Sequence, residues 1–197
     1  MDVRSIIGAG LLGFAFATPA SAVVVVYTSA LSGAAESPPV ISAGTGFTTV
    51  TTDDVLRTMR VQVNFAGLTG NVTQAHIHCC TATPGAGNVG VASELPSFTG
   101  FPLGGTSGTY DRTFDLTLAS SFGTGFLNSN GGTPATAFAA LAGGLNSGRA
   151  YLNVHSTSAL SGEIRGFLAP IPEPETYALM LAGLAAVGLA VRRRRAA

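Results

Sequence analysis

An alternation of apolar and polar residues with a period of two constrains the fold of this chain more than any other feature. Within residues 56–65, one set of alternate positions is apolar and the other is polar: Met59, Val61, Val63 and Phe65 against Arg60, Gln62 and Asn64. Side chains of a β-strand point to opposite faces in turn, so the pattern is typical of a strand with one buried face. Residues 106–118 alternate in the same way around Tyr110 and Phe114.

Shorter runs rich in β-branched residues indicate further strands. They are predicted at residues 23–31, 47–52, 72–78, 151–155 and 163–168. One helix is predicted over residues 135–142, with Thr133 as N-cap, Pro134 at the first position and Gly143-Gly144 as its end. The whole indicates a mainly β fold: an antiparallel β-sandwich, immunoglobulin-like or superoxide-dismutase-like, with one short helix.

The N-terminal residues 1–22 are predicted to be a signal peptide, which forms a helix and lies outside the folded domain. Arg4 precedes an apolar run over residues 6–17, and the small residues Ala20-Ser21-Ala22 follow. The apolar run is shorter than the roughly 20 residues that a membrane span needs. Cleavage is predicted before Val23, which begins the main domain, residues 23–168.

The C-terminal residues 169–197 have the order of a sorting tail. Pro172-Glu173-Pro174 precedes a short apolar stretch at residues 177–191, a predicted transmembrane helix, and Arg192, Arg193, Arg194 and Arg195 follow at once. Such an arginine cluster resists translocation, so the main domain is expected outside the membrane. The order of the three parts resembles the PEP-CTERM sorting signal, which implies processing by an exosortase-type enzyme. A permanent single-span anchor is the alternative.

The balance of charge in the main domain argues against nucleic acid as a partner. The formal net charge of zero includes the arginines of the two ends. Between Val23 and Ile171 there are five arginines and seven acidic residues, and the chain contains no lysine. A basic stripe is therefore missing from the sequence of the main domain.

Three motifs in order resemble a CHRD (chordin-repeat) domain. They begin at Leu31, Gly67 and Tyr151 and read LSGAAESPPV, GLTG followed by AHIH, and YLNVH followed by SGEIRG. The resemblance covers most of the chain between its two ends and implies an extracellular domain. The chain departs from the family pattern at Cys79-Cys80, where a glycine-containing turn is usual.

All three histidines of the chain lie in these motifs. His76 and His78 are two apart on a predicted strand and share a face, and His155 joins them if its strand lies alongside. Three imidazoles with an open position suit zinc or copper, and Cys80 has the parity of a fourth ligand if the strand continues. The alternative is a hydrogen-bonded cluster that holds the two strands in register.

The adjacent residues Cys79 and Cys80 leave several states open. An exported protein meets an oxidising compartment, where cysteines tend to pair. Neighbouring Cα atoms are closer than in ordinary disulfides, so a bridge between them would be strained. Metal ligation, a link to another molecule and two free thiols are the alternatives.

Glu163 and Arg165 share a face of the last predicted strand and are predicted to form a structural ion pair.

The chain lacks a Gly-x-Ser-x-Gly elbow and a phosphate-binding glycine loop, and we expect no enzymatic activity. The function expected from sequence is an exported, non-enzymatic binding module of the cell surface or extracellular matrix of a Gram-negative-type bacterium, associated with biofilm or exopolysaccharide. The alternative is an extracytoplasmic copper- or zinc-binding protein that uses His76, His78 and His155, with weak redox activity.

Overall fold

The computed structural model describes residues 23–171 and 181–184 of the 197-residue chain. Its strands are β1 (Val24–Ser32), β2 (Thr45–Asp53), β3 (Thr58–Ala66), β4 (Val72–His78), β5 (Gly108–Asp115), β6 (Tyr151–Ser156), β7 (Ile164–Phe167) and β8 (Ala169–Pro170). The helices are α1 (Thr124–Ser129) and α2 (Pro134–Asn146), with short 3₁₀ turns η1 (Gly33–Ala35) and η2 (Ala119–Ser121). The predicted signal peptide lies outside the described residues.

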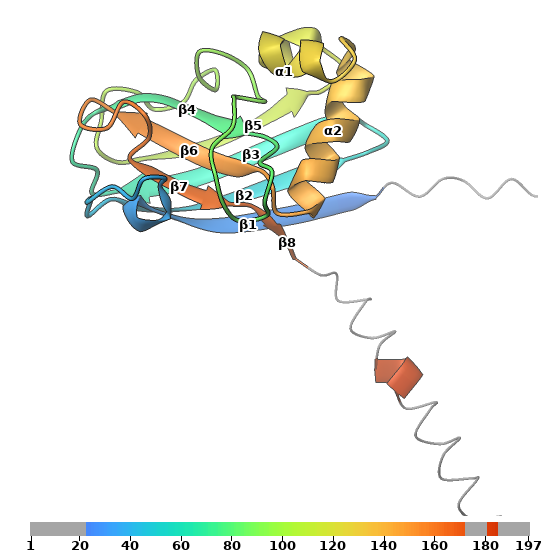
Figure 1. The fold of residues 1–197 in the computed structure, drawn as a ribbon, viewed down its shortest axis with the longest axis horizontal. Helices are drawn as coiled ribbons and strands as arrows, with labels where there is room; N and C mark the ends of the chain where they lie inside the picture. Colours follow the sequence, from blue (N-terminus) through green and yellow to red (C-terminus); the bar gives the residue numbers. More distant parts are fainter. Residues whose placement is uncertain (1–22, 172–180, 185–197) are drawn as a thin grey trace, which may run out of the picture.

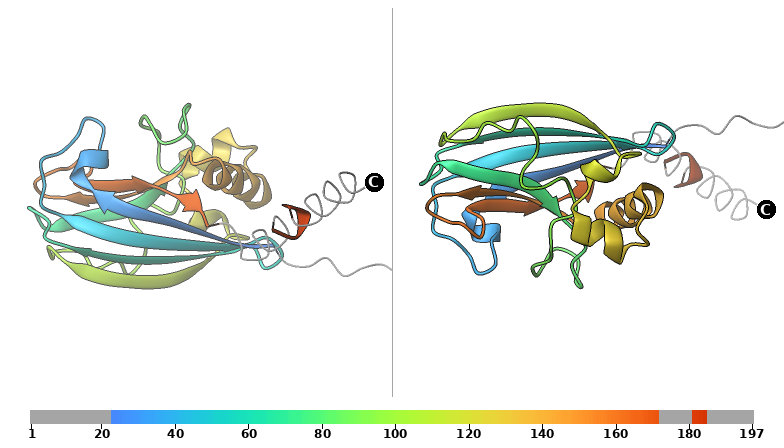
Figure 2. Two further views of the ribbon diagram at one scale, coloured as in Figure 1. Left: turned by 90° about the horizontal axis from the view of Figure 1, so that it is seen from below. Right: turned by 90° about the horizontal axis from the view of Figure 1, so that it is seen from above.

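All eight strands form one antiparallel sheet that curls around the core (Figures 1 and 2). The strand order is β4-β6-β7-β1-β2-β3-β5, and β8 adds to β1. The predicted mainly β, antiparallel fold is confirmed, although the strands form a single curled sheet. β1 pairs with β2 along its whole length, from Val24 opposite Asp53 to Ser32 opposite Thr45. β2 pairs with β3 in the same way, and Thr45 lies opposite Ala66.

The residues of the strands alternate between the core and the outer face, as their sequence pattern predicts. On β3, Met59, Val61, Val63 and Phe65 are buried, while Arg60 and Asn64 are exposed. Ala137, Leu141 and Leu145 of α2 belong to the same apolar core. The core is therefore built from the inner face of the curled sheet and one side of this helix.

The segment at residues 91–105 lies between β4 and β5, the two outermost strands of the sheet. Its backbone bonds to β4 through Ala92 N to Ile77 O and Phe98 N to Ala75 O, at 2.8 and 2.9 Å. On the other side, the Tyr110 hydroxyl of β5 donates to Thr99 O at 3.0 Å. This segment thus joins the two outer strands.

Cys79 and Cys80 form a disulfide with each other directly after β4. This is the bridge that the sequence left as one of four alternatives. The disulfide packs on α2 at Gly144, where a Cβ atom would collide with both sulfur atoms. The helix therefore runs through Gly143-Gly144, which the sequence suggested as its end, and closes at Asn146. Thr133 is the N-cap, as predicted, and its hydroxyl accepts a hydrogen bond from Thr136 N.

A Gly144→Ala variant is expected to lose about 1–3 kcal/mol of unfolding free energy, because the added methyl group has no room beside the disulfide. Gly143→Ala is the matched control: a Cβ atom there meets nothing within 4 Å, and alanine favours the helix by about 0.5–1 kcal/mol. Urea unfolding of both variants measures the difference. Equal stabilities would mean that the disulfide does not limit the approach of α2.

Within residues 23–171 and 181–184, the structure holds no helix with the length and apolar character needed to span a bilayer. Residues 181–184 are helical and belong to the predicted transmembrane stretch. The rest of that stretch and the four terminal arginines lie outside the described residues.

Candidate metal centre

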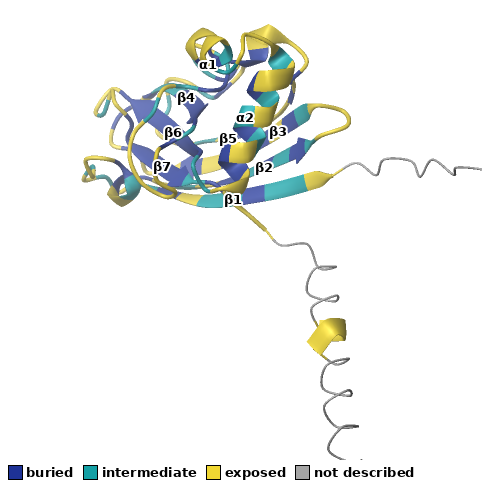
Figure 3. Cartoon of the chain, turned by 45° about the vertical axis from the view of Figure 1, so that its right-hand side comes forward, coloured by how far each residue is buried: buried dark blue, intermediate teal, exposed yellow. Residues whose placement is uncertain are grey.

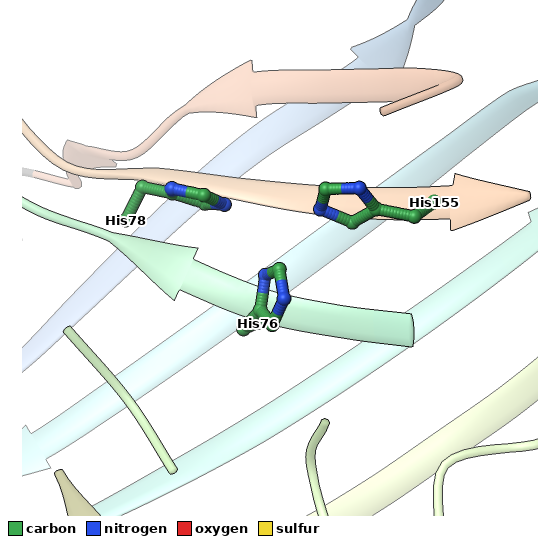
Figure 4. Close-up of side chains that lie close together, drawn as sticks. All are labelled: His76, His78 and His155. Atoms are coloured by element: carbon green, nitrogen blue, oxygen red, sulfur yellow. The ribbon is translucent and has the colours of Figure 1, made fainter. Parts of the chain in front are cut away.

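The three histidines meet on the face of the sheet that is turned away from the core. β4 and β6 are antiparallel neighbours, with His76 opposite Asn153. Ala75 and Ile77 of β4 lie in the apolar core, so the alternate residues His76 and His78 point to the opposite face. His155 shares this face because it is two residues beyond Asn153. The three rings point toward one another (Figure 4).

The geometry of the group suits one metal ion. The ring centroid of His76 lies 4.9 Å from that of His78 and 4.6 Å from that of His155. One nitrogen from each residue lies within 4.8 Å of the other two. Three nitrogens spread evenly around one ion at about 2.0–2.1 Å lie about 3.5–3.6 Å apart. Rotation of the rings would therefore have to bring the three nitrogens closer together to reach a common ion.

Two of the rings are held by backbone carbonyl groups. His78 Nδ1 lies 2.7 Å from Val89 O, and His155 Nδ1 lies 2.9 Å from Leu160 O. A carbonyl oxygen can only accept, so in both rings Nδ1 carries the hydrogen and Nε2 presents its lone pair. This is the arrangement in which metal-binding histidines are usually held.

Each ring also has a buried nitrogen without a hydrogen-bond partner among the described residues. These atoms are His76 Nδ1, His78 Nε2 and His155 Nε2. A buried polar atom without a partner is unfavourable by about 1–3 kcal/mol, and native proteins contain few. Three of them in one group point to a ligand that all three nitrogens share.

The rings are neutral at pH 7 and are thus in the state that binds metal. Burial, together with the smaller effects of the neighbouring His155 and His78, lowers the pKa of His76 to about 3. Burial also lowers the pKa of His78 to about 4 and shifts that of His155 in the same direction. A metal ion would therefore not have to displace a proton from these rings.

Tyr151 and Arg165 support the group from one side. The Tyr151 ring stacks on His78 with centroids 4.7 Å apart and planes inclined by 4°. The Arg165 guanidinium lies 4.7 Å from the centroid of the Tyr151 ring. The stack of three flat side chains fixes the orientation of His78.

Cys80 is not part of the group, in contrast to its prediction as a fourth ligand. β4 ends at His78, so the alternation that would bring Cys80 to the histidine face stops before it. Its sulfur is bonded to Cys79 and lies 3.6 Å from Ala140 O of α2. The protein ligands that the structure brings together are therefore three imidazole nitrogens.

Glu163 and Arg165 are both buried but do not pair with each other, which corrects the predicted ion pair. Arg165 lies 3.6 Å from Glu36, the glutamate that follows η1. It also donates from Nη1 to Asn88 Oδ1 at 2.7 Å, which ties the loop of Val89 to β7. Burial raises the pKa of Glu36 to about 7, although the charge of Arg165 opposes this.

Glu163 instead binds a cluster of hydrogen-bond donors from other parts of the chain. Its carboxylate accepts from Thr69 N at 2.5 Å, Gly70 N at 3.3 Å and the Ser42 hydroxyl at 2.6 Å, and also from the Ser156 hydroxyl. Burial alone would raise the pKa of Glu163, but these hydrogen bonds hold it below its ordinary value. The residue joins the second and third sequence motifs in space.

A curled antiparallel domain with a buried three-histidine group on its outer face defines a β-protein with a candidate transition-metal site. The chain belongs to the CHRD domain family, which it matches over residues 27–168. The resemblance noted from the three sequence motifs is thus confirmed. No curated protein and no solved structure matches the chain.

The C-terminal segment matches the PEP-CTERM protein-sorting motif over residues 170–195. This match confirms the second predicted resemblance. The motif implies processing by an exosortase-type enzyme and an exported precursor that is anchored in the membrane of a Gram-negative bacterium. Cleavage before Val23 stays a prediction.

Proposed function

We propose that this protein is an exported, non-enzymatic module of the cell surface or matrix that binds one copper or zinc ion through His76, His78 and His155. The observation that carries the proposal is a group of three buried rings that lie close enough to share an ion, each with a buried nitrogen that has no hydrogen-bond partner among the described residues. Imidazole is a good ligand for both ions. Delivery to the surface is supported by the sorting motif at residues 170–195.

A hydrogen-bonded histidine cluster explains the same residues less well. In such a cluster the facing nitrogens would bond to one another or to neighbours. Here the only hydrogen bonds of these rings among the described residues run outward, to Val89 O and Leu160 O.

The proposal is tested by metal analysis of the mature protein recovered from the producing cells. We expect about one copper or zinc ion per chain. After chelation, adding the ion at 100 times its Kd should stabilise the domain by about 2.7 kcal/mol, a rise in Tm of about 5–10 °C. Mg²⁺ is the control and should have no effect, because it prefers oxygen ligands. The proposal would be refuted if the recovered protein contained neither ion and its Tm did not change when either ion was added.

A further inference from the structure

Five exposed apolar side chains gather at one end of the domain. Val23 and Val24 lie at the start of β1, Val55 and Leu56 form the turn between β2 and β3, and Ile171 follows β8. Val24 is opposite Asp53 in the register of β1 and β2, and Ile171 N donates to Val26 O at 2.8 Å. Figure 3 shows the start of β1 and the turn exposed at the same end. We name these five residues the apolar end.

The C-terminal tail leaves the domain from the apolar end. Ile171 is directly followed by Pro172, and the apolar stretch of the tail begins at Tyr177. A fully extended chain spans at most about 3.3–3.6 Å per residue, so the linking residues reach about 20 Å. While the tail is in the bilayer, the apolar end is therefore held close to the lipid surface. The β6–β7 turn lies at the opposite end of the sheet (Figure 1).

The charges at this end favour contact with uncharged or zwitterionic lipid. Asp53 accepts hydrogen bonds from the amides of Val55 and Leu56, and Asp54 accepts one from Val23 N at 2.8 Å. Arg57 is the basic residue of the turn. A basic cluster that would attract anionic lipids is missing from this described surface. Apolar side chains beside backbone-bound carboxylates suit shallow insertion among the headgroups.

We propose that the apolar end is a lipid-contacting surface, which rests on the outer face of the membrane while the precursor is anchored. The inference rests on the exported, membrane-anchored precursor that the sorting motif implies. Contact at this end holds Pro172-Glu173-Pro174 at the lipid surface, where a membrane enzyme can reach it. Five surface side chains bind a bilayer weakly by themselves, so removal of the tail releases the domain.

The absence of tryptophan from the chain allows a direct test with a single reporter. The chain without the predicted signal peptide, residues 23–197, carrying Leu56→Trp, is reconstituted into phosphatidylcholine vesicles that contain brominated phosphatidylcholine. We expect the Trp emission to shift to the blue and to lose at least half of its intensity by quenching. Leu160→Trp, in the exposed β6–β7 turn, is the matched control and should keep its emission.

Flotation of the same vesicles separates failure of the contact from failure of the anchor. If the chain floats with the vesicles but Leu56→Trp is not quenched, or is quenched no more than Leu160→Trp, the lipid-contacting surface is refuted and the anchor stands. If the chain does not float, the anchor and the inference fail together. Replacing part of the lipid by phosphatidylglycerol should not increase quenching, and an increase in proportion to the anionic lipid would overturn apolar contact.

Discussion

A His76→Leu variant is expected to lose copper or zinc binding by at least about 100-fold, while the metal-free domain stays as stable as the wild type or gains about 1 kcal/mol. The variant removes one of the three metal ligands. Loss of a residue that only supports a ligand already lowers metal affinity about 10–100-fold, so loss of the ligand itself should lower it more. Leucine also removes a buried nitrogen without a partner, which is unfavourable in the metal-free domain. Titration calorimetry and urea unfolding in chelator measure the two quantities.

Gln74→Leu is the control for this variant. Gln74 lies on β4 two residues before His76, on the same face and opposite His155 in the register. Its replacement should leave metal binding unchanged, because it is not among the three facing rings. If instead His76→Leu destabilises the metal-free domain by 2 kcal/mol or more, and the wild type binds neither ion, the histidines serve the structure alone.

A Glu163→Ala variant is expected to lower the unfolding free energy by about 3–5 kcal/mol, the largest effect on stability that we predict. The change leaves the amides of Thr69 and Gly70 and the hydroxyls of Ser42 and Ser156 without their acceptor. The hydrogen bonds of Gly70 N and the Ser156 hydroxyl are buried and those of Thr69 N and the Ser42 hydroxyl partly buried. Each buried donor without a partner is unfavourable by about 1–3 kcal/mol, and water entering the space offsets part of this. The expected fall in Tm is about 10 °C or more.

Glu94→Ala is the comparison, since that carboxylate accepts one hydrogen bond, from Thr99 N, and should contribute under 1 kcal/mol. The contribution of Glu163 should also depend on pH. Its pKa is lowered in the folded state, so its stabilisation is present above the unfolded value of about 4.5 and is lost as the pH falls below it. A Glu163→Ala domain that unfolds at the same urea concentration as the wild type would contradict this account.

Seven of the eight strands were predictable because each carries its own pattern, whereas the two-residue β8 was missed. Alternation placed β3, and the run of residues 72–78 coincides with β4 as the structure has it. The last four residues of α2, 143–146, were not predictable, because Gly143-Gly144 is locally a helix end. Glycine is needed at position 144 because the disulfide leaves no room for a Cβ atom, a contact between residues far apart in the chain. The short helix α1 was missed as well, since its glycine and asparagine are weak helix formers.

The candidate site was predictable where parity along a strand decides. His76 and His78 had to share a face, and only the pairing of β4 with β6 had to be assumed for His155. The roles of Cys80, Glu163 and Arg165 depend on partners that parity does not reveal. Arg165 turns to Glu36 and Glu163 to Thr69 and Gly70 because those segments fold over β7. Val89 and Leu160 act through their backbone oxygens, which leave no signal in the residue type.

The segment that joins β4 to β5 also bears on how the domain behaves at high concentration. Its backbone occupies the outer side of β4, and Tyr110 and Arg112 of β5 both donate to Thr99 O of the same segment. Sheets with bare, uncharged borders recruit strands from other molecules and grow into fibrils. A molecule whose sheet borders are covered in this way can reach a high local density and still remain a separate folded unit.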